Sequence, residues 1–588
     1  MKVTALVVLF GLFALSGPGF AAQSQKQLTY RGTTSLAAAT ASATQDIGLE
    51  IRPGLDVDAI FSRLAKGAVS PARVPADHVP KPPDSAIVGV LSGAGFNGLT
   101  HRDQRLASGG NQFSSEPPDQ GLAVGQGYII EAVNSAIRVR TIDGNVAMPA
   151  VGLNEFFLLA PSINRATGDF GPFTSDPKAY YDVGVKRWFV SMLEIDQDRV
   201  TGDFLPRSAV LLAVSKTSSP LGDWHLYSID TTNNSGTSDH AGCPCFGDQP
   251  LIGADEYGFY VSTNEFPIFQ GGFNGAQVYA MSKAKLAAGP SGTATVVAFS
   301  GLPLAEGSAY TLQPAITAQG GLHDTARGGT EYFLSALDFN NSLDNRIAVW
   351  AVTNSRSLDD AVPNLSLQSV VIDSQVYGAP PSTQQRPGPT PLADLIKSGA
   401  FGKASAQILP LVASNDDRMQ QVTWADGKLW SSLNTVVKPQ KGPVHSGAAY
   451  FVVSPGWSSG ALDAAVVKQG YVSLSNHSVI YPSVGVNRWG RGVMSFSIVG
   501  DDVYPSVGFV RMDAVQGTGP ISIVALGAAP DDGFSGYAFF GGRVGRWGDY
   551  SAAVADADGT IWFANEYIPA ASRTVLANWG TFIGRVVP

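Results

Sequence analysis

The sequence is poor in charged side chains, and its basic residues are the scarcer ones. Only 15% of the 588 residues are charged, and 39 Lys and Arg against 48 Asp and Glu give a formal net charge of −9. No run of basic residues occurs anywhere along the chain. Because nucleic-acid binding needs concentrated Lys and Arg to neutralise phosphates, the composition argues against a nucleic-acid partner.

Histidine is also rare, and the best-known catalytic motifs are missing. The chain has 7 histidines, with no His-x-x-x-His or His-Glu-x-x-His spacing, so the sequence argues against a zinc peptidase. It contains no Walker sequence. The glycines that match the spacing of a Gly-x-Ser-x-Gly elbow (456–460) or of a dinucleotide-binding fingerprint (93–98) stand among turn and loop residues, where backbone geometry alone explains them. The sequence therefore requires no cofactor.

No apolar run is long enough to span a bilayer, and the longest one stands at the N-terminus. Lys2 is followed by apolar residues from Val3 to Leu15 and then by small residues up to Ala21 and Ala22. This pattern predicts a secretory signal peptide over residues 1–22, and no cysteine stands near the expected cleavage point to carry a lipid. We expect a secreted or periplasmic, soluble monomer.

Helical periodicity is absent as well, whereas glycine and proline are abundant. Residues 23–94 are rich in Ala, Ser, Thr, Gln and Pro, which predicts a mobile low-complexity leader with one short helix from Val57 to Leu64. From Gly95 onward the chain reads as short strands separated by turns, in keeping with its 66 Gly and 37 Pro.

One strand–turn–strand element recurs seven times between Gly95 and the C-terminus. Each copy opens on a polar residue or tyrosine, continues as an apolar strand, turns, and returns as a second strand that ends on a polar residue. Recurrence of one such element indicates a repeat architecture. The sequence predicts an all-β, seven-bladed β-propeller of four-stranded antiparallel blades over residues 95–588, with a long insertion at about 355–417.

The polar residues at the two strand ends form two predicted rings. In an antiparallel hairpin the start of the first strand lies beside the end of the second, so both rings fall on one face of the disc, around the central channel. The opening ring is Asp119, Asp176, Asp248, Gln313, Gln420, Tyr481 and Asp549, and the closing ring is Asn134, Glu194, Glu265, Asp338, Asn434, Ser497 and Glu566.

These rings predict a funnel crowded with carboxylates. Crowded carboxylates must be protonated, hydrogen-bonded to backbone N–H groups, or neutralised by Arg or a cation such as Ca²⁺. One interpretation is a catalytic site in which paired carboxylates act as acid and base; the other is a structural role at strand ends and between blades. The predicted catalytic residues are Asp176, Glu194, Asp248 and Glu265, and the predicted substrate-binding residues are Asp119, Asp338, Arg546, Trp547, Asp549 and Glu566.

Cys243 and Cys245 are the only cysteines, and they stand just before the third repeat. In an exported protein they predict a disulfide, although a bridge across one intervening residue closes a small ring. With His240 nearby, a soft-metal site or a redox-active pair are the alternatives.

Two of the hairpins have the same sequence pattern. Asp426-Gly427-Lys428-Leu429-Trp430 and Asp558-Gly559-Thr560-Ile561-Trp562 resemble the Asp-box hairpins of sialidase-like, BNR-repeat propellers. The resemblance covers blades and no catalytic motif, and it implies a propeller that acts on an extracellular polysaccharide or other glycan.

The sequence hypothesis is thus a secreted glycan-active protein, either a hydrolase or a lyase. A hydrolase would use two ring carboxylates, whereas a lyase would use a proton-abstracting residue beside a neutralising group, with Tyr481, His240 and Arg546 as candidates. The alternative is a non-catalytic exported binding module whose rings are structural, with Ca²⁺ as a possible stabilising ion.

Overall fold

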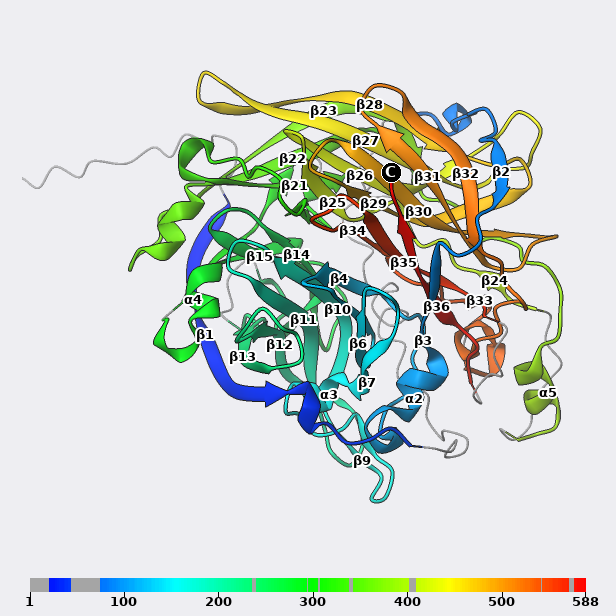
Figure 1. The fold of residues 1–588 in the computed structure, drawn as a ribbon, viewed down its shortest axis with the longest axis horizontal. Coiled ribbons are helices and arrows are strands. Elements are labelled where there is room, and N and C mark those ends of the chain that lie inside the picture. Colours follow the sequence, from blue (N-terminus) through cyan, green and yellow to red (C-terminus); the bar gives the residue numbers. More distant parts are fainter. Residues whose placement is uncertain are drawn as a thin grey trace, which may run out of the picture.

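The computed structural model describes residues 21–43, 74–234, 240–292, 294–304, 307–337, 342–400, 409–540, 542–569 and 576–588. These residues form an all-β fold of antiparallel sheets, as predicted (Figure 1). The described helices are short, and none is long and apolar enough to cross a membrane. Residues 1–20 of the predicted signal peptide, the helix predicted from Val57 to Leu64, and Asp338 lie outside the described residues.

Within the described ranges, the strands group into seven antiparallel units of four, which we number in chain order. Units 1 to 3 consist of β4 (Gly121–Gly125), β5 (Tyr128–Val133), β6 (Ala136–Thr141) and β7 (Val146–Gly152); β10 (Phe173–Asp182), β11 (Arg187–Gln197), β12 (Phe204–Ser215) and β13 (Asp223–Asp230); and β14 (Cys245–Ala254), β15 (Gly258–Pro267), β16 (Ala276–Ser282) and β17 (Thr295–Ser300).

Units 4 to 6 repeat the same order along the chain. They consist of β20 (Gln313–Thr317), β21 (Thr330–Ala336), β22 (Leu343–Thr353) and β23 (Ser366–Gly378); β25 (Val422–Ala425), β26 (Lys428–Val437), β27 (His445–Ser458) and β28 (Ala461–Val472); and β29 (His477–Val486), β30 (Arg491–Gly500), β31 (Ser506–Asp513) and β32 (Gly517–Ala525).

Unit 7 combines the first strand of the repeat region, which begins at Gly95, with the last three strands of the chain. Its first three strands are β34 (Ala552–Ala555), β35 (Ile561–Tyr567) and β36 (Gly580–Val586), and its fourth is β3 (Gly95–Thr100), which pairs antiparallel with β36. The first strands of neighbouring units contact one another all the way round, from β4 through β10, β14, β20, β25 and β29 to β34 and back to β4. The seven units therefore surround a common centre.

The remaining elements are connections. The helices are α2 (His101–Gly110), α3 (Leu153–Phe156), α4 (Lys283–Ala287) and α5 (Pro391–Lys397), and the short strands are β8 (Ile163–Asn164), β9 (Asp169–Phe170), β18 (Pro303–Leu304), β19 (Gly307–Ser308), β24 (Leu411–Val412) and β33 (Val544–Gly545). The 3-10 turns are η1 (Leu36–Ala38), η2 (Ala76–His78), η4 (Gly289–Ser291), η5 (Ala326–Gly328), η6 (Ser355–Asp359), η7 (Phe534–Gly536) and η8 (Ala538–Phe540).

The segment predicted as a mobile leader contains regular structure. Strand β1 (Ala22–Ser35) pairs antiparallel first with β17 and then with β13, so it lies along the outer strands of units 3 and 2. Strand β2 (Ile87–Val90) pairs parallel with β32 of unit 6. The prediction of an irregular leader is therefore wrong for residues 22–35 and 87–90, because backbone hydrogen bonds to an exposed sheet edge order a sequence with few apolar side chains.

The predicted insertion at about 355–417 also contains a strand of the repeat. Its residues 366–378 form β23, the fourth strand of unit 4, which pairs along most of its length with β22. Side chains on β23 are mostly half-buried or exposed, so the strand lacks the apolar run by which the inner strands were recognised. The insertion proper is limited to the residues after β23, which include α5 and β24.

The hydrophobic core lies between neighbouring units. The tryptophans that follow the hairpin turns, Trp188, Trp430 and Trp562, are all fully buried, which confirms that they pack the sheets together. Trp489, at the corresponding place in unit 6, is instead 55% exposed and stacks with the Arg488 guanidinium.

Three asparagines, each at the end of the second strand of its unit, join that unit to the following one. Asn134, Asn264 and Asn434 each accept, through Oδ1, the backbone N–H at the start of the following unit: that of Asp176 at 3.0 Å, Thr311 at 2.8 Å and Tyr481 at 2.7 Å. All three amides are buried. Since a buried N–H without a partner is costly, these bonds fix how neighbouring units meet.

We expect Asn134→Ala to lower the free energy of unfolding by about 2–3 kcal/mol, because it removes the partners of several buried polar groups. Besides the Asp176 N–H, Asn134 donates from Nδ2 to the Pro117 carbonyl at 2.6 Å and to Asp119 Oδ2 at 2.7 Å. Chemical denaturation would measure the change, with the exposed Asn145→Ala in the same unit as a control. Equal stability of both variants would contradict a clamping role for Asn134.

Candidate functional site

The described members of the two predicted rings lie at one end of the hairpins, but the sequence placed the third repeat one residue out of register. Asp176, Gln249 and Tyr481 each precede a proline, have a left-handed backbone (φ of 58°, 50° and 51°) and stand at a β-bulge of the first strand. Gln249, rather than Asp248, is therefore the third member of the opening ring. Because successive residues of a strand point to opposite sides, this shift changes what Asp248 contacts.

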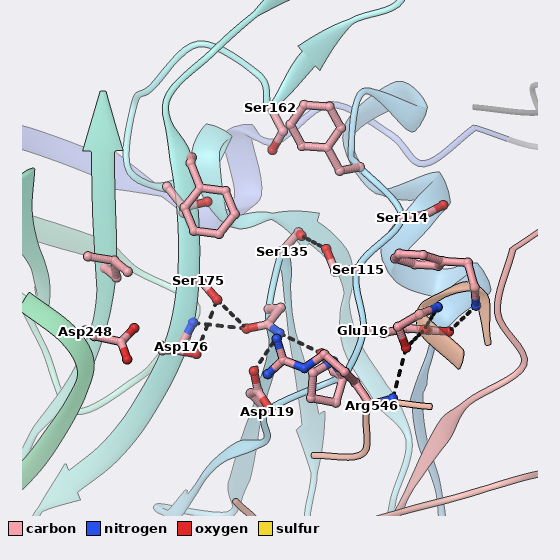
Figure 2. A pocket seen from close by; sticks show the side chains of 18 residues that line it. Ser114, Ser115, Glu116, Asp119, Ser135, Ser162, Ser175, Asp176, Asp248 and Arg546 are labelled. Atoms are coloured by element: carbon pink, nitrogen blue, oxygen red, sulfur yellow. Dashed lines mark hydrogen bonds between the residues drawn. The ribbon is translucent and has the colours of Figure 1, made fainter. Parts of the chain in front are cut away.

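A pocket opens beside units 1, 2 and 3, at the ring end of the strands. The space among its lining residues, with the adjoining open solvent included, is about 690 Å³, and the pocket is partly open to solvent. Figure 2 shows that serine hydroxyls, carboxylates and Arg546 surround it. Its apolar walls are the rings of Phe113, Phe173 and Phe534 together with Leu193.

Two of the four predicted catalytic carboxylates line this pocket from neighbouring units. Asp176 lies on β10 and Asp248 on β14, and the two are labelled side by side in Figure 2. The Asp176 carboxylate accepts the Ser175 hydroxyl at 3.2 Å and the backbone N–H of Gln249 at 3.2 Å. These contacts fix the Asp176 side chain at the boundary between units 2 and 3.

The other two predicted catalytic residues lie elsewhere. Glu194 is buried and paired with Arg31 of β1 at 3.0 Å and Arg207 at 3.4 Å. Glu265 is buried against His240, whose Nδ1 is 2.8 Å from its Oε1. Neither glutamate lines the pocket, so the structure brings together only the two aspartates of the predicted four.

Asp119 and Arg546, two of the predicted substrate-binding residues, also line the pocket. Asp119 accepts the Asn134 amide and, through Oδ1, the backbone N–H of Asp549 at 2.8 Å. Burial, with Asp549 and Asp176 nearby, raises the pKa of Asp119 well above its usual value. Arg546 binds Asp549 at 2.8 Å, and Asp549 also accepts the Asn415 amide at 3.1 Å.

Two other predicted substrate-binding residues lie inside the protein. Trp547 is 1% exposed, packs in the core and donates from Nε1 to the Ser497 hydroxyl at 3.3 Å, so its ring offers no open face to a substrate. Glu566 is buried and accepts the Gly548 N–H at 2.6 Å. The glycine-rich loop of residues 542–548 thus turns Trp547 inward and presents Arg546 to the pocket.

Glu116 is a pocket residue that the repeat pattern did not indicate. It accepts the backbone N–H of Phe534 at 3.1 Å and the N–H and hydroxyl of Ser535 at 2.9 and 2.6 Å, as Figure 2 shows. It therefore holds the loop after unit 6 against the segment that precedes unit 1. Glu116 lies before the first repeat, where no periodicity marks it; the Glu-Pro-Pro sequence at 116–118 is the only local signal.

Two basic residues also lie near the ring, and one of them, Lys178, was not indicated by the repeat pattern. Lys178, two residues after Asp176, lies with its ammonium over the Tyr550 ring, and burial lowers its pKa well below the usual value. Arg418 forms a bidentate pair with Asp416 and donates to Gln249 Oε1 at 2.7 Å. These cations offset part of the negative charge of Asp119, Asp176 and Asp549.

The structure contains the disulfide between Cys243 and Cys245, which confirms that prediction. Within the described part of the chain, His240, Cys243 and Glu265 are the one group with three potential metal-ligand atoms within 4.8 Å of one another. This group lies at the closing end of β15, outside the pocket.

We expect Glu566→Gln to reduce the dependence of stability on pH. Burial, with Asp531, Asp119 and Glu116 nearby, raises the pKa of Glu566 well above 4.5. The folded protein therefore holds this proton more tightly than the unfolded chain, and stability falls as pH rises from about 4.5 toward the raised pKa. Melting temperatures at about pH 5 and pH 8 should differ less in Glu566→Gln than in the wild type. Glu194→Gln, which removes an ion-paired carboxylate, is the control; an unchanged pH dependence in Glu566→Gln would contradict the prediction.

No protein-family model and no curated protein sequence matches the chain. Solved structures similar to it include a protein of unknown function from Dyadobacter fermentans, with 10% identity and a TM-score of 0.29 over 70% of this chain and 95% of that one. A sialidase from Trypanosoma rangeli in complex with sialic acid has 11% identity and a TM-score of 0.32 over 79% of this chain and 59% of the sialidase. An α-L-arabinofuranosidase from Podospora anserina in complex with cellotriose has 13% identity and a TM-score of 0.23 over 60% of this chain and 94% of that one. Sialidases are thus among the similar structures, as the Asp-Gly hairpins predicted, but likenesses this distant carry no conclusion about activity.

Proposed function

We propose that the chain is an exported seven-bladed β-propeller that hydrolyses glycosidic bonds in its acidic pocket. The seven four-stranded units, with their first strands in a closed circle, are the arrangement expected of propeller blades. The proposal of export is supported by the N-terminal sequence and by the disulfide, which is typical of oxidising compartments.

The observation that carries the hydrolase proposal is that Asp176 and Asp248, from neighbouring units, line one pocket. Most glycoside hydrolases use two carboxyl groups on either side of the scissile bond, one as general acid and the other as base or nucleophile. The pocket adds groups that suit a sugar: hydroxyls of Ser135, Ser162 and Ser175 for hydrogen bonds, and the ring of Phe173 for an apolar sugar face.

Hydrolysis is better supported than elimination. Of the three residues considered for a lyase, Arg546 alone lines the pocket. Tyr481 is 1% exposed in the core, and His240 is held by Glu265 next to the disulfide. A general base must come within hydrogen-bonding distance of the proton it removes, so these positions do not assemble a lyase site.

A non-catalytic binding module is the second candidate, and it is favoured by the bonding of the ring. Asp119 and Glu116 both accept backbone N–H groups of other segments, as structural carboxylates do. Ca²⁺ bound to ring oxygens would add to such a role. A melting temperature that rises with Ca²⁺ and falls with a chelator, without any turnover, would favour this candidate.

We expect the mature protein to release reducing ends from at least one member of a polysaccharide panel. Asp176→Asn and Asp248→Asn should each lower the rate by about 10²–10⁴-fold, the usual contribution of a general acid or base. Glu194→Gln is the matched control: it changes a buried carboxylate of the same end of the fold that lies outside the pocket. Melting temperatures of all variants separate loss of catalysis from loss of folding.

Each outcome of this experiment decides between the candidates. Unsaturated products would show elimination and overturn the hydrolase proposal. Equal losses in the two aspartate variants and in Glu194→Gln would show that the pocket is not the site. No product with any substrate, from a folded wild-type protein, would leave the binding module as the better explanation.

A further inference from the structure

The disulfide lies against a buried histidine–glutamate pair at the end of unit 3. Glu265 Oε1 is 2.8 Å from His240 Nδ1 and 3.7 Å from Cys243 Sγ. The same oxygen accepts the Asn274 amide at 2.9 Å, and that amide also lies 3.5 Å from Cys245 Sγ. Glu265 is 1% exposed, whereas Cys243 and His240 are half-buried, so the cluster has a buried floor and an accessible side.

These three side chains have the composition and spacing of an incomplete zinc site. Zn²⁺ binds thiolate sulfur at about 2.3 Å and imidazole nitrogen or carboxylate oxygen at about 2.0 Å, which places tetrahedral donors about 3.3–3.5 Å apart. The separations of 2.8 and 3.7 Å need changes of only about half an ångström to meet this geometry. What the oxidised protein lacks is the thiolate, since a disulfide sulfur is a poor metal ligand.

We propose that reduction of the Cys243–Cys245 disulfide converts this cluster into a binding site for a thiophilic divalent cation such as Zn²⁺. The reductant is a dithiol or a phosphine. A dithiol gives two electrons and two protons to the disulfide and is itself oxidised to a disulfide. A phosphine is oxidised to the phosphine oxide, with water supplying the oxygen atom and the two protons of the thiols. Zn²⁺ then displaces the proton of the Cys243 thiol and binds Cys243 Sγ, His240 Nδ1 and Glu265 Oε1, and Cys245 Sγ or water completes four ligands.

The charge balance and the surroundings favour this conversion. One thiolate and one carboxylate neutralise the divalent ion, which lowers the cost of holding it in a partly buried site. Glu265 is fixed by β15 and by the amides of Asn233 and Asn274, so this donor needs little rearrangement. Lys26 is the nearby competing cation, and its ammonium is held by Asn233 and the Asp230 carbonyl.

Zn²⁺ binding to tag-free protein, measured by competition with a chromophoric chelator, tests the proposal. The oxidised wild type should not compete, and the phosphine-reduced protein, desalted without oxygen, should bind one equivalent. Cys245→Ser leaves a permanent thiol at Cys243 and should bind one equivalent without any reductant. Cys243→Ser should not bind in either condition.

Two further variants and a folding control make the result decisive. In the Cys245→Ser background, His240→Ala and Glu265→Gln should each weaken Zn²⁺ binding at least tenfold, in the range expected when a group of a metal site is lost. Circular dichroism and melting curves verify that each variant is folded; the reduced wild type supplies the same answer if Cys245→Ser is not. Absence of binding by the folded reduced protein, or equal binding by Cys243→Ser, would overturn the proposal.

Discussion

The pairing of β3 with β36 is the constraint on which the rest of the structure depends. Residues 95–100 and 580–586 come from opposite ends of the chain, and their hydrogen bonds complete the last unit and with it the circle of seven. Hydrophobic clusters extend across neighbouring units, as between units 5, 6 and 7 and between units 1 and 2. The positions of residues that meet across the ring, such as Asp119 and Asp549, follow from this closure.

The same end of the fold has to satisfy two demands. Asn134, Asn264 and Asn434 use their amides to join neighbouring units, and Asp119 and Glu116 use their carboxylates to hold backbone N–H groups. Many of the polar residues at this end of the fold therefore join neighbouring units by hydrogen bonds. Asp176 likewise accepts a backbone N–H, that of Gln249, and it lines the pocket together with Asp248, Asp119 and Glu116. The functional proposal rests on Asp176 and Asp248 because they face one pocket from neighbouring units.

The sequence predicted the repeat well, because each copy carries its own strand, turn and strand, and in units 2, 5 and 7 a buried Trp after the turn packs the sheet. The assignment of ring residues was wrong in the third repeat, where the correct residues differ from the predicted ones by one position along the strand. In the third repeat the acidic Asp248 was matched with Asp176, although the proline that follows Gln249 marks the equivalent position. For the same reason the closing residue of that unit was taken as Glu265 rather than Asn264, which makes the inter-unit bond.

Other features could not be predicted because they depend on partners far away in sequence. Strand β1 has few apolar residues and is ordered by the edges of units 2 and 3, and Glu116 meets Phe534 and Ser535 only after the ring has closed. Trp547 follows a turn-rich loop, which suggested exposure, yet the loop folds it into the core. Local pattern thus predicts the repeats, whereas the pocket is assembled from the connections between them.

The course of β1 has a consequence for association between molecules. An open outer strand presents a row of unsatisfied N–H and C=O groups, on which a second chain can add a strand. Residues 22–35 occupy the edges of β17 and β13, and residues 87–90 occupy that of β32, so three of the outer edges are closed from within the molecule. The N-terminal segment therefore covers sheet edges on which a second chain could otherwise add a strand. This pairing uses backbone N–H and C=O groups, which every residue except proline supplies.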